Sequence, residues 1–298
     1  MIQETEWIAY VNGEYVFQSE AKLSIFDHGV LYGDGVFDAF CAWNRQIFKL
    51  DQHIDRLFKS LNVFQIDMPL SKEDLKKIVI EVAQRNKENN QYFKCMVTRG
   101  VGPRPLLSPI GCKPSVVVFS RPYLWLSAKG SALENGVKAR ISNMRAIPAQ
   151  CMDHKSKNLN YAHFVLIKIE ALSAGADEAI ILDLDGFVNE GPGYNVFVVN
   201  GDKLFTPSSS EGILAGITRE TVFEIAKQQG LEAIEARISP YDIYNADELF
   251  FSSTAGAIIP VVEVDGRRVA SGIPGPITKR IYELYFEMLE KGVYGTLF

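Results

Sequence analysis

The most regular pattern of apolar and polar residues in this chain lies between residues 51 and 62. Four apolar side chains recur there with the spacing of one helix face: Ile54, Leu57, Phe58 and Leu61. This spacing predicts an amphipathic helix whose apolar face packs on a core. Arg56 falls nearly opposite that face, so periodicity alone predicts that its side chain points into solvent.

The rest of the N-terminal part is predicted to form a hairpin, a second helix and two strands. Asn12-Gly13 readily takes the positive φ angles of a type I′ turn, which predicts a hairpin over 7–17. Ser71 begins a sequence typical of a helix start and predicts a helix over 72–86. The two predicted strands are 92–99 and 114–120.

Strands and helices follow one another beyond residue 136, and short turns separate several of them. Asp185-Gly186, Asn200-Gly201 and Asp265-Gly266 are pairs typical of tight turns. The elements predicted in this part are strands near 137–142, 178–184, 195–199 and 248–252, and helices at 161–172, 217–229 and 276–291.

The length of 298 residues is sufficient for two domains, each with its own core. A segment richer in small and polar residues, 127–136, is the predicted linker. It would join a small α+β domain, 1–126, to a larger mixed α/β domain, 137–298. The predicted fold class is therefore α/β.

Composition and charge exclude several classes of protein. Hydrophobic residues make up 47% and charged residues 22%, as in ordinary globular proteins. The net charge of −5 argues against nucleic acid or an anionic membrane as the main partner. Residues 1–7 are acidic where a signal peptide is basic, and no apolar run approaches the ~18 residues of a membrane-spanning helix.

The cysteines and histidines favour a cytoplasmic protein without a metal site. Neither set shows the spacing of a zinc site or of a disulfide framework, and scattered cysteines are typical of reduced thiols. The residues are Cys41, Cys95, Cys112 and Cys151, and His28, His53, His154 and His163.

Candidate chemistry begins in the segment 151–161, which carries Lys155 and Lys157 next to an apolar helix. A lysine that the fold desolvates can have a lowered pKa, and its neutral amine is then a nucleophile. Most lysines, however, are solvated surface residues, so this segment indicates chemistry only together with other features.

Three other features could complete a cofactor site. Glu190 lies in a glycine-rich turn, Gly216 opens a helix whose first N–H groups can bind phosphate, and Thr254 follows a strand. Each also has a purely structural explanation, as a turn carboxylate, an ordinary helix start or a hydroxyl that bonds to nearby backbone. A lysine, a carboxylate and a phosphate-binding helix start are together what pyridoxal 5′-phosphate needs, because the carboxylate keeps the ring nitrogen protonated.

Nearly the whole chain, from about residue 10 to 278, resembles the class IV (fold-type IV) aminotransferases. The motifs that carry the resemblance are Phe-Asp-His-Gly-x-x-x-Gly-Asp-Gly-x-Phe (26–37), His53-x-x-Arg56-Leu57, Lys157-x-x-Asn-Tyr161, Glu190-Gly-x-x-x-Asn195, Gly216-Ile-Thr-Arg219 and Ser253-Thr254-Ala255. The resemblance implies two domains with the cofactor cleft between them. It also implies a ping-pong transfer of an amino group from an amine or amino acid to a 2-oxo acid.

The resemblance assigns roles to individual residues. Lys157 would bind the cofactor aldehyde and move the proton, because family members carry Lys-x-Glu-Ala eleven residues after that lysine, and here the element begins at Lys168. That spacing selects Lys157 over Lys155. Glu190 would pair with the pyridine nitrogen and Tyr161 with the ring hydroxyl. The phosphate ligands that the resemblance implies are Arg56, Ile217, Thr218 and Thr254.

The substrate motifs give a mixed answer. Branched-chain L-amino-acid members bind the substrate carboxylate partly with a Tyr-x-Arg element, but here Tyr92-Phe-Lys94 replaces the planar fork with a point charge. The loop 98–104 resembles that of D-amino-acid and (R)-amine transaminases, in which a loop arginine can bind the carboxylate. Leu106, however, stands where D-amino-acid members usually carry histidine. Whether Lys94 or Arg104 binds the carboxylate stays open.

Local matches at 37–43, 122–125 and 285–288 look most like the (R)-amine group, so the sequence favours an (R)-amine, D-type or mixed specificity. The alternative is a branched-chain L-amino-acid aminotransferase, and the second alternative is an aminodeoxychorismate lyase-like enzyme. A binding module without activity would have no use for the whole lysine–glutamate–phosphate set. The other predicted substrate contacts are Tyr32, Phe37, Tyr92, Ala255 and Gly256.

The family resemblance also implies a homodimer in which each active site is completed by the neighbouring subunit. We expect the 26–37 segment and the 101–107 loop to lie at that two-fold interface. The glycines of 26–37 would allow the backbone to approach a ligand or another chain closely.

Overall fold

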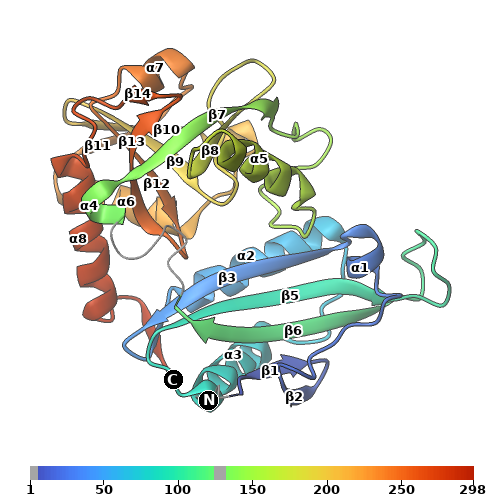
Figure 1. Ribbon diagram of the computed structural model, residues 1–298. Coiled ribbons are helices and arrows are strands. Elements are labelled where there is room, and N and C mark those ends of the chain that lie inside the picture. The colour runs from blue at the N-terminus through green and yellow to red at the C-terminus, as the bar shows by residue number, and fades with distance from the viewer. Residues whose placement is uncertain (1–5, 124–131) are drawn as a thin grey trace. The chain divides into compact units, whose positions relative to one another are not determined.

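The computed structural model describes residues 6–123 and 132–298, and the chain forms two compact units (Figure 1). The first unit is Met1–Leu124 with Ser156–Asn160 and Leu289–Phe298, and the second is Trp125–Lys155 with Tyr161–Met288. Residues 127–131 of the predicted linker 127–136 lie outside the described residues, and the next four form helix α4 (Ala132–Asn135). Two segments within the predicted C-terminal domain 137–298 belong instead to the first unit: Ser156–Asn160 and Leu289–Phe298.

The first unit contains an antiparallel sheet with two helices packed on one face. Within the described residues it has seven strands in the order β15-β4-β3-β5-β6-β1-β2. These strands are β15 (Gly295–Leu297), β4 (Gln46–Phe48), β3 (Gly35–Trp43), β5 (Gln91–Val101), β6 (Lys113–Pro122), β1 (Ile8–Val11) and β2 (Glu14–Phe17). The helices are α1 (His28–Tyr32), α2 (Leu50–Phe64) and α3 (Lys72–Asn86). The predicted hairpin, both predicted helices and both predicted strands are confirmed.

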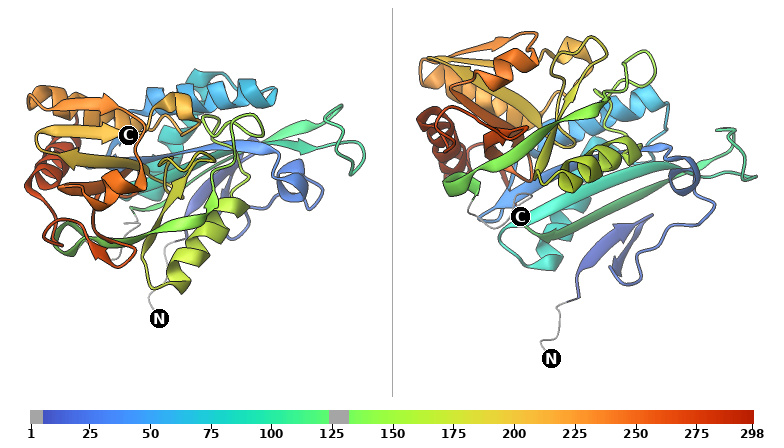
Figure 2. Two further views of the ribbon diagram at one scale, coloured as in Figure 1. Left: turned by 90° about the horizontal axis from the view of Figure 1, so that it is seen from above. Right: turned by 45° about the horizontal axis from the view of Figure 1, so that its top comes forward.

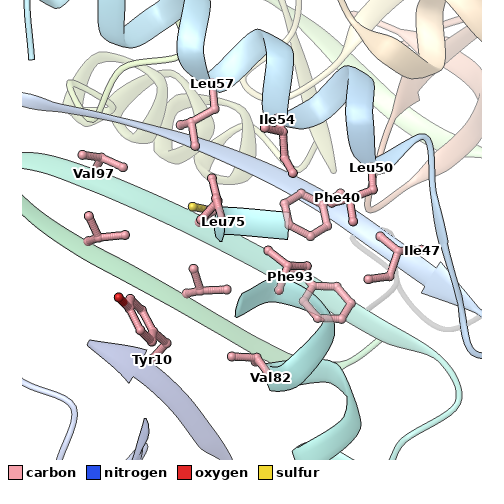
Figure 3. Packing of buried hydrophobic residues seen from close by; sticks show 14 of the residues in the cluster. Tyr10, Phe40, Ile47, Leu50, Ile54, Leu57, Leu75, Val82, Phe93 and Val97 are labelled. Carbon is pink, nitrogen blue, oxygen red and sulfur yellow. The ribbon is translucent and has the colours of Figure 1, made fainter. Parts of the chain in front are cut away.

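The apolar face of α2 packs on the sheet, as its periodicity predicts. Figure 3 shows side chains of Leu50, Ile54 and Leu57 directed from α2 towards the aromatic residues of the sheet. There the rings of Phe40 and Phe93 stack with 5.2 Å between their centroids.

The prediction that Arg56 points into solvent is wrong. Its side chain is only 11% exposed, because Asp38 on β3 forms an ion pair with it. Helix α2 therefore buries a polar stripe beside its apolar one, and that stripe carries His53, Arg56 and Ser60.

The second unit contains a mixed sheet. Its order is β11-β10-β9-β12-β13-β7-β8, with β14 paired to β13, and the pairs β10–β11, β13–β7 and β7–β8 are parallel. The strands are β7 (Val137–Arg145), β8 (Glu178–Leu182), β9 (Asn195–Asn200), β10 (Lys203–Thr206), β11 (Glu232–Glu235), β12 (Glu248–Ser253), β13 (Ala257–Val264) and β14 (Arg267–Arg268). The helices are α5 (Ala162–Ser173), the short 3-10 helix η2 (Ser209–Glu211), α6 (Ile217–Gln228), α7 (Pro240–Tyr244) and α8 (Pro276–Glu290), of which α8 continues into the first unit.

The predicted strands and helices of this part are confirmed, as is the α/β fold class. The sequence predicts a hairpin at Asp265-Gly266, which β13 and β14 form, but gives no bounds for β13. That strand carries Pro260 in its middle, where proline argues against a strand. The core of this unit is rich in aromatic residues, and the rings of Phe197 and Phe250 stack at 4.9 Å.

One long loop protrudes from the first unit. The loop 102–112 between β5 and β6 extends beyond the rest of its unit, as Figures 1 and 2 show. Across the described part of the chain, no helix combines the length and the apolar character needed to cross a membrane.

Candidate active site

The lysine segment Ser156–Asn160 runs antiparallel along the first residues of β3, within the first unit. The Phe37 N–H donates to the Lys157 carbonyl at 2.8 Å, and the Leu159 N–H donates to the Gly35 carbonyl at 2.9 Å. On its other side the Lys157 N–H donates to Ser60 Oγ of α2 at 3.1 Å. The backbone of Lys157 is therefore fixed by a strand and a helix, whereas Lys155 is exposed.

One face of the first sheet brings Phe37, Tyr92 and Lys94 together with the Lys157 side chain. The register of β3 and β5 pairs Phe37 with Met96 and Ala39 with Lys94. Phe93, which lies between Tyr92 and Lys94 on β5, points to the opposite face and into the core. The Lys157 and Lys94 ammonium groups lie 4.7 and 4.3 Å from the centroid of the Phe37 ring. Burial lowers the pKa of Lys94, and the charge of Lys157 lowers it further.

Arg56 and His53 both reach the buried carboxylate of Asp38. Arg56 donates from Nε to Oδ2 at 2.7 Å and from Nη2 to Oδ1 at 2.8 Å, and His53 Nδ1 lies 2.7 Å from Oδ1. Burial alone would raise the pKa of Asp38, but the charges and hydrogen bonds of Arg56 and His53 outweigh it and hold that pKa well below its usual range. Arg56 is thus a paired arginine, only 11% exposed, on the same helix as Ser60, which contacts the Lys157 backbone.

The two remaining substrate candidates of this unit lie elsewhere in it. Tyr32 ends α1 and its hydroxyl donates to the Pro105 carbonyl at 3.3 Å. Arg104 is exposed in the loop 102–112. The shared contact with the Phe37 ring groups Lys94 with Lys157.

In the second unit Glu190 is a buried carboxylate with fixed partners. It is 6% exposed, and its Oε2 accepts a hydrogen bond from the Leu214 N–H at 3.1 Å. Its Oε1 lies 3.8 Å from His154 Nδ1. The turn that carries it closes with hydrogen bonds between Gly191 and Tyr194, and Tyr194 donates to the buried Glu178 at 3.0 Å.

The start of α6 lies beside this carboxylate, because Leu214 connects the two. Its N–H donates to Glu190, and its carbonyl accepts from Asn195 Nδ2 at 2.9 Å. The N-cap residue of α6 is Gly216, which has no side chain that could accept from the first N–H groups of the helix. The first N–H groups of a helix have no partner within the helix, so this start suits an anion.

The other motif residues of the second unit have these positions. Ile217 and Thr218 are buried in the first turn of α6, 4% and 3% exposed. Arg219 instead pairs with Glu235 at 2.5 Å, which is a structural role. Tyr161 precedes α5, and Thr254, Ala255 and Gly256 form the turn between β12 and β13.

Each cluster by itself fits part of pyridoxal phosphate. In the first unit a half-buried lysine offers an amine, and an arginine held by an ion pair suits a phosphate. In the second unit a buried carboxylate can accept a protonated ring nitrogen, and the start of α6 suits a phosphate. The family profile described as "Amino-transferase class IV" matches residues 35–264. The chain belongs to the class IV aminotransferases and is a pyridoxal phosphate-dependent transaminase.

Individual relatives match over nearly their full length. A Methanocaldococcus jannaschii protein to which branched-chain-amino-acid aminotransferase activity is provisionally assigned is 41% identical, over 95% of this chain and 96% of the relative. The D-alanine aminotransferase of Bacillus licheniformis is 36% identical, over 91% and 93%. The T.th. branched-chain amino acid aminotransferase, solved with N-(5′-phosphopyridoxyl)-L-glutamate, superposes with a TM-score of 0.91 at 31% identity and covers 98% of both chains.

Sequence reasoning gave no role of their own to four residues of these two clusters: Asp38, His53, Ser60 and His154. His53 entered only through the motif His53-x-x-Arg56-Leu57, and Asp38 only through the local match at 37–43. The signal that could have found Ser60 is its position four residues after Arg56, on the same helix face.

Gly216 is needed for the close approach of Asn195 to α6. A Cβ at Gly216 would collide with the Asn195 side chain, which holds the Leu214 carbonyl. We expect Gly216→Ala to displace Leu214 from Glu190, to lower the melting temperature and to weaken binding of pyridoxal phosphate about tenfold or more, since a hydrogen bond to a charged group contributes about 1.5–3 kcal/mol.

Gly193→Ala is the matched control, because Gly193 lies in the Glu190 turn and no described atom lies within 4 Å of the added Cβ. Thermal unfolding and a cofactor titration of both variants measure the difference. Equal effects of the two substitutions would show that the contact with Asn195 has no special importance.

Proposed function

We propose that this enzyme transfers the amino group of a branched-chain L-amino acid to a 2-oxo acid. The observation that carries the proposal is the 41% identity, along nearly the whole chain, to a relative assigned that activity. The likeness to the T.th. branched-chain enzyme supports it. The predicted preference for an (R)-amine or D-type substrate is not confirmed, and the comparisons favour the alternative. The D-alanine aminotransferase relative keeps D-alanine as the second candidate substrate.

The proposed machinery assigns a role to each residue. When bound, pyridoxal phosphate supplies an aldehyde that takes up the amino group and a ring that withdraws electrons from the reacting carbon. The Lys157 amine would hold the cofactor at rest and then move the proton at the substrate carbon. Glu190, kept in place by the Leu214 N–H, would hold a proton on the ring nitrogen, and Tyr161 would bond to the ring hydroxyl. The proposed phosphate ligands are Arg56, Ile217, Thr218 and Thr254.

Lys94 is the residue that we propose for the substrate carboxylate. It is the cation that shares the Phe37 ring with Lys157, so a carboxylate bound there lies next to the reacting amine. Phe37 and Tyr92 on the same sheet face provide apolar surface for a branched side chain. The other proposed substrate contacts are Tyr32, Ala255 and Gly256, with Arg104 as the alternative carboxylate ligand.

A substrate panel tests the proposed reaction. We expect the purified enzyme with 2-oxoglutarate to consume L-leucine faster than D-alanine or (R)-1-phenylethylamine, measured as glutamate formed. Lys157→Ala should lower the rate by about 10²- to 10⁴-fold or more, since it removes the proton-transfer group. Lys155→Ala should retain activity, because Lys155 is exposed. A faster reaction with either of the other two substrates would overturn the proposed specificity.

The pH dependence tests the role of Lys94. Only its charged form binds a carboxylate, and burial lowers its pKa from 10.5, so Lys94 loses its proton at a lower pH than an exposed lysine. We therefore expect kcat/KM for the 2-oxo acid to fall as the pH rises through the lowered pKa. Lys94→Arg should remove this fall, because a guanidinium stays charged.

Lys94→Met should raise KM about 10- to 100-fold below the lowered pKa, through the loss of a charged hydrogen bond, and should approach the wild type above it. Lys59→Arg, an exposed lysine on α2, is the control and should leave the profile unchanged. If Lys94→Arg keeps the wild-type fall, another group is titrating and the assignment of Lys94 is wrong.

We also propose that the enzyme is a homodimer. Large apolar side chains are exposed in the segment 25–31 and in the loop 102–112, which overlap the regions 26–37 and 101–107 that the family resemblance places at an interface. They are Ile25, Phe26, Val30, Leu31, Leu106, Leu107 and Ile110, 40% to 80% exposed. Light scattering should give about twice the chain mass of 33.3 kDa. Ile110→Asp should shift the enzyme towards the monomer. The control is Ile273→Asp, which changes another exposed isoleucine, in the second unit, and should leave the dimer intact. A wild-type enzyme that is monomeric contradicts the proposal.

We propose a cytoplasmic location on narrower grounds. Cys41 and Cys95 are buried free thiols, and burial raises the pKa of Cys41 to about 12. Such thiols are typical of a reducing compartment. Fractionation of cells that express the tagged chain checks the location.

A further inference from the structure

Asp38 is the most fully hydrogen-bonded buried carboxylate near the Lys157 segment. It is 1% exposed. Its Oδ1 accepts from the Ala39 N–H at 2.8 Å and from Arg56 Nη2 at 2.8 Å, and lies 2.7 Å from His53 Nδ1. Its Oδ2 accepts from Arg56 Nε at 2.7 Å. This set of contacts fixes the carboxylate in one orientation.

The contacts also fix the orientation of Arg56. Nε and Nη2 form one edge of the planar guanidinium, and both donate to the same carboxylate. A bidentate pair of this kind leaves the guanidinium no freedom to rotate, so the direction of its Nη1 N–H groups is set by Asp38.

His53 completes the pair without adding charge. Burial lowers the pKa of His53, which favours the neutral ring, and Asp38 is ionised. A neutral ring can donate its Nδ1 proton to the carboxylate. The cluster then contains one negative group, the Asp38 carboxylate, and one positive group, the Arg56 guanidinium. The neutral His53 ring contributes a hydrogen bond to Asp38 and no charge.

The same strand and helix position the lysine backbone. Asp38 follows Phe37, whose N–H donates to the Lys157 carbonyl. Arg56 precedes Ser60 by one helical turn, and Ser60 Oγ donates to the Arg56 carbonyl and accepts from the Lys157 N–H. The arginine and the lysine are thus both located relative to adjacent residues of β3.

Stability alone gives little reason for a buried ion pair at this place. Replacement of such a pair by packed apolar residues is often neutral or stabilising, whereas a fixed orientation is useful where a ligand must be bound. We propose that Asp38 is a positioning residue, which orients the Arg56 guanidinium so that it binds the phosphate group of pyridoxal phosphate. This inference rests on the proposed phosphate role of Arg56.

A double-mutant cycle tests the inference on the full chain stripped of cofactor. The proteins are wild type, Asp38→Asn, Arg56→Gln and the double variant, each titrated with pyridoxal phosphate and with pyridoxal, which lacks the phosphate. Asp55→Asn is the control, since it removes the same charge from an exposed pair of α2 with Lys72. Circular dichroism and thermal unfolding establish that each variant is folded.

We expect Asp38→Asn to weaken binding of pyridoxal phosphate about 10- to 100-fold, the usual effect of losing a residue that orients a ligand-binding group. Binding of pyridoxal should change less than about threefold. In the Arg56→Gln background the same substitution should have almost no further effect, because Asp38 then has no arginine to orient. Asp55→Asn should bind both ligands as wild type does.

Other outcomes separate the two ideas. If Arg56→Gln leaves binding of pyridoxal phosphate unchanged, the proposed phosphate role of Arg56 fails. If Arg56→Gln weakens it and Asp38→Asn does not, only the positioning role of Asp38 fails. Equal losses for pyridoxal and pyridoxal phosphate, or additive effects in the cycle, would make Asp38 a purely structural residue.

A second variant covers the case in which Asp38→Asn does not fold. Asp38→Glu keeps the charge but moves the carboxylate by one methylene group, so it should bind pyridoxal phosphate more weakly while pyridoxal is unaffected. A folded Asp38→Glu protein with wild-type affinity for pyridoxal phosphate would overturn the positioning role.

Discussion

The attachment of the Lys157 backbone to β3 and α2 is the constraint on which the first unit's chemistry depends. Its carbonyl and N–H are both occupied, by Phe37 and by Ser60. A lysine side chain is long and flexible, and fixing its backbone on two sides restricts the positions that the amine can reach. The same two elements orient Arg56 and present the Phe37 ring beneath the amine.

The second unit obtains comparable order from Leu214. Its peptide groups bond to Glu190 on one side and to Asn195 on the other, so the carboxylate and the start of α6 are fixed relative to each other. Gly216 makes this geometry possible, because only a residue without a side chain fits against Asn195. Backbone groups, of which a substitution can remove only the N–H and only by introducing proline, thus carry much of the organisation of both clusters.

Sequence patterns predicted the elements well where local spacing decides them. The apolar stripe of α2 and the Asn12-Gly13 turn are examples, because their causes lie within a few residues. Arg56 was misplaced because its partner Asp38 lies 18 residues earlier, on a strand. The pairing of residues 157–159 with β3 was equally invisible, since nothing in either segment's composition specifies it. The preference for (R)-amines came from short matches, which carry less weight than identity along the whole chain.

Neither unit is one continuous stretch of the chain, and this affects how the protein is made. The start of β3 is paired by residues 157–159, and β4 is paired by β15 at 295–297. On a ribosome the first sheet therefore exposes open hydrogen-bonding edges until those distant residues have been synthesised. Open edges invite pairing with other chains, so premature termination late in translation would release an aggregation-prone sheet.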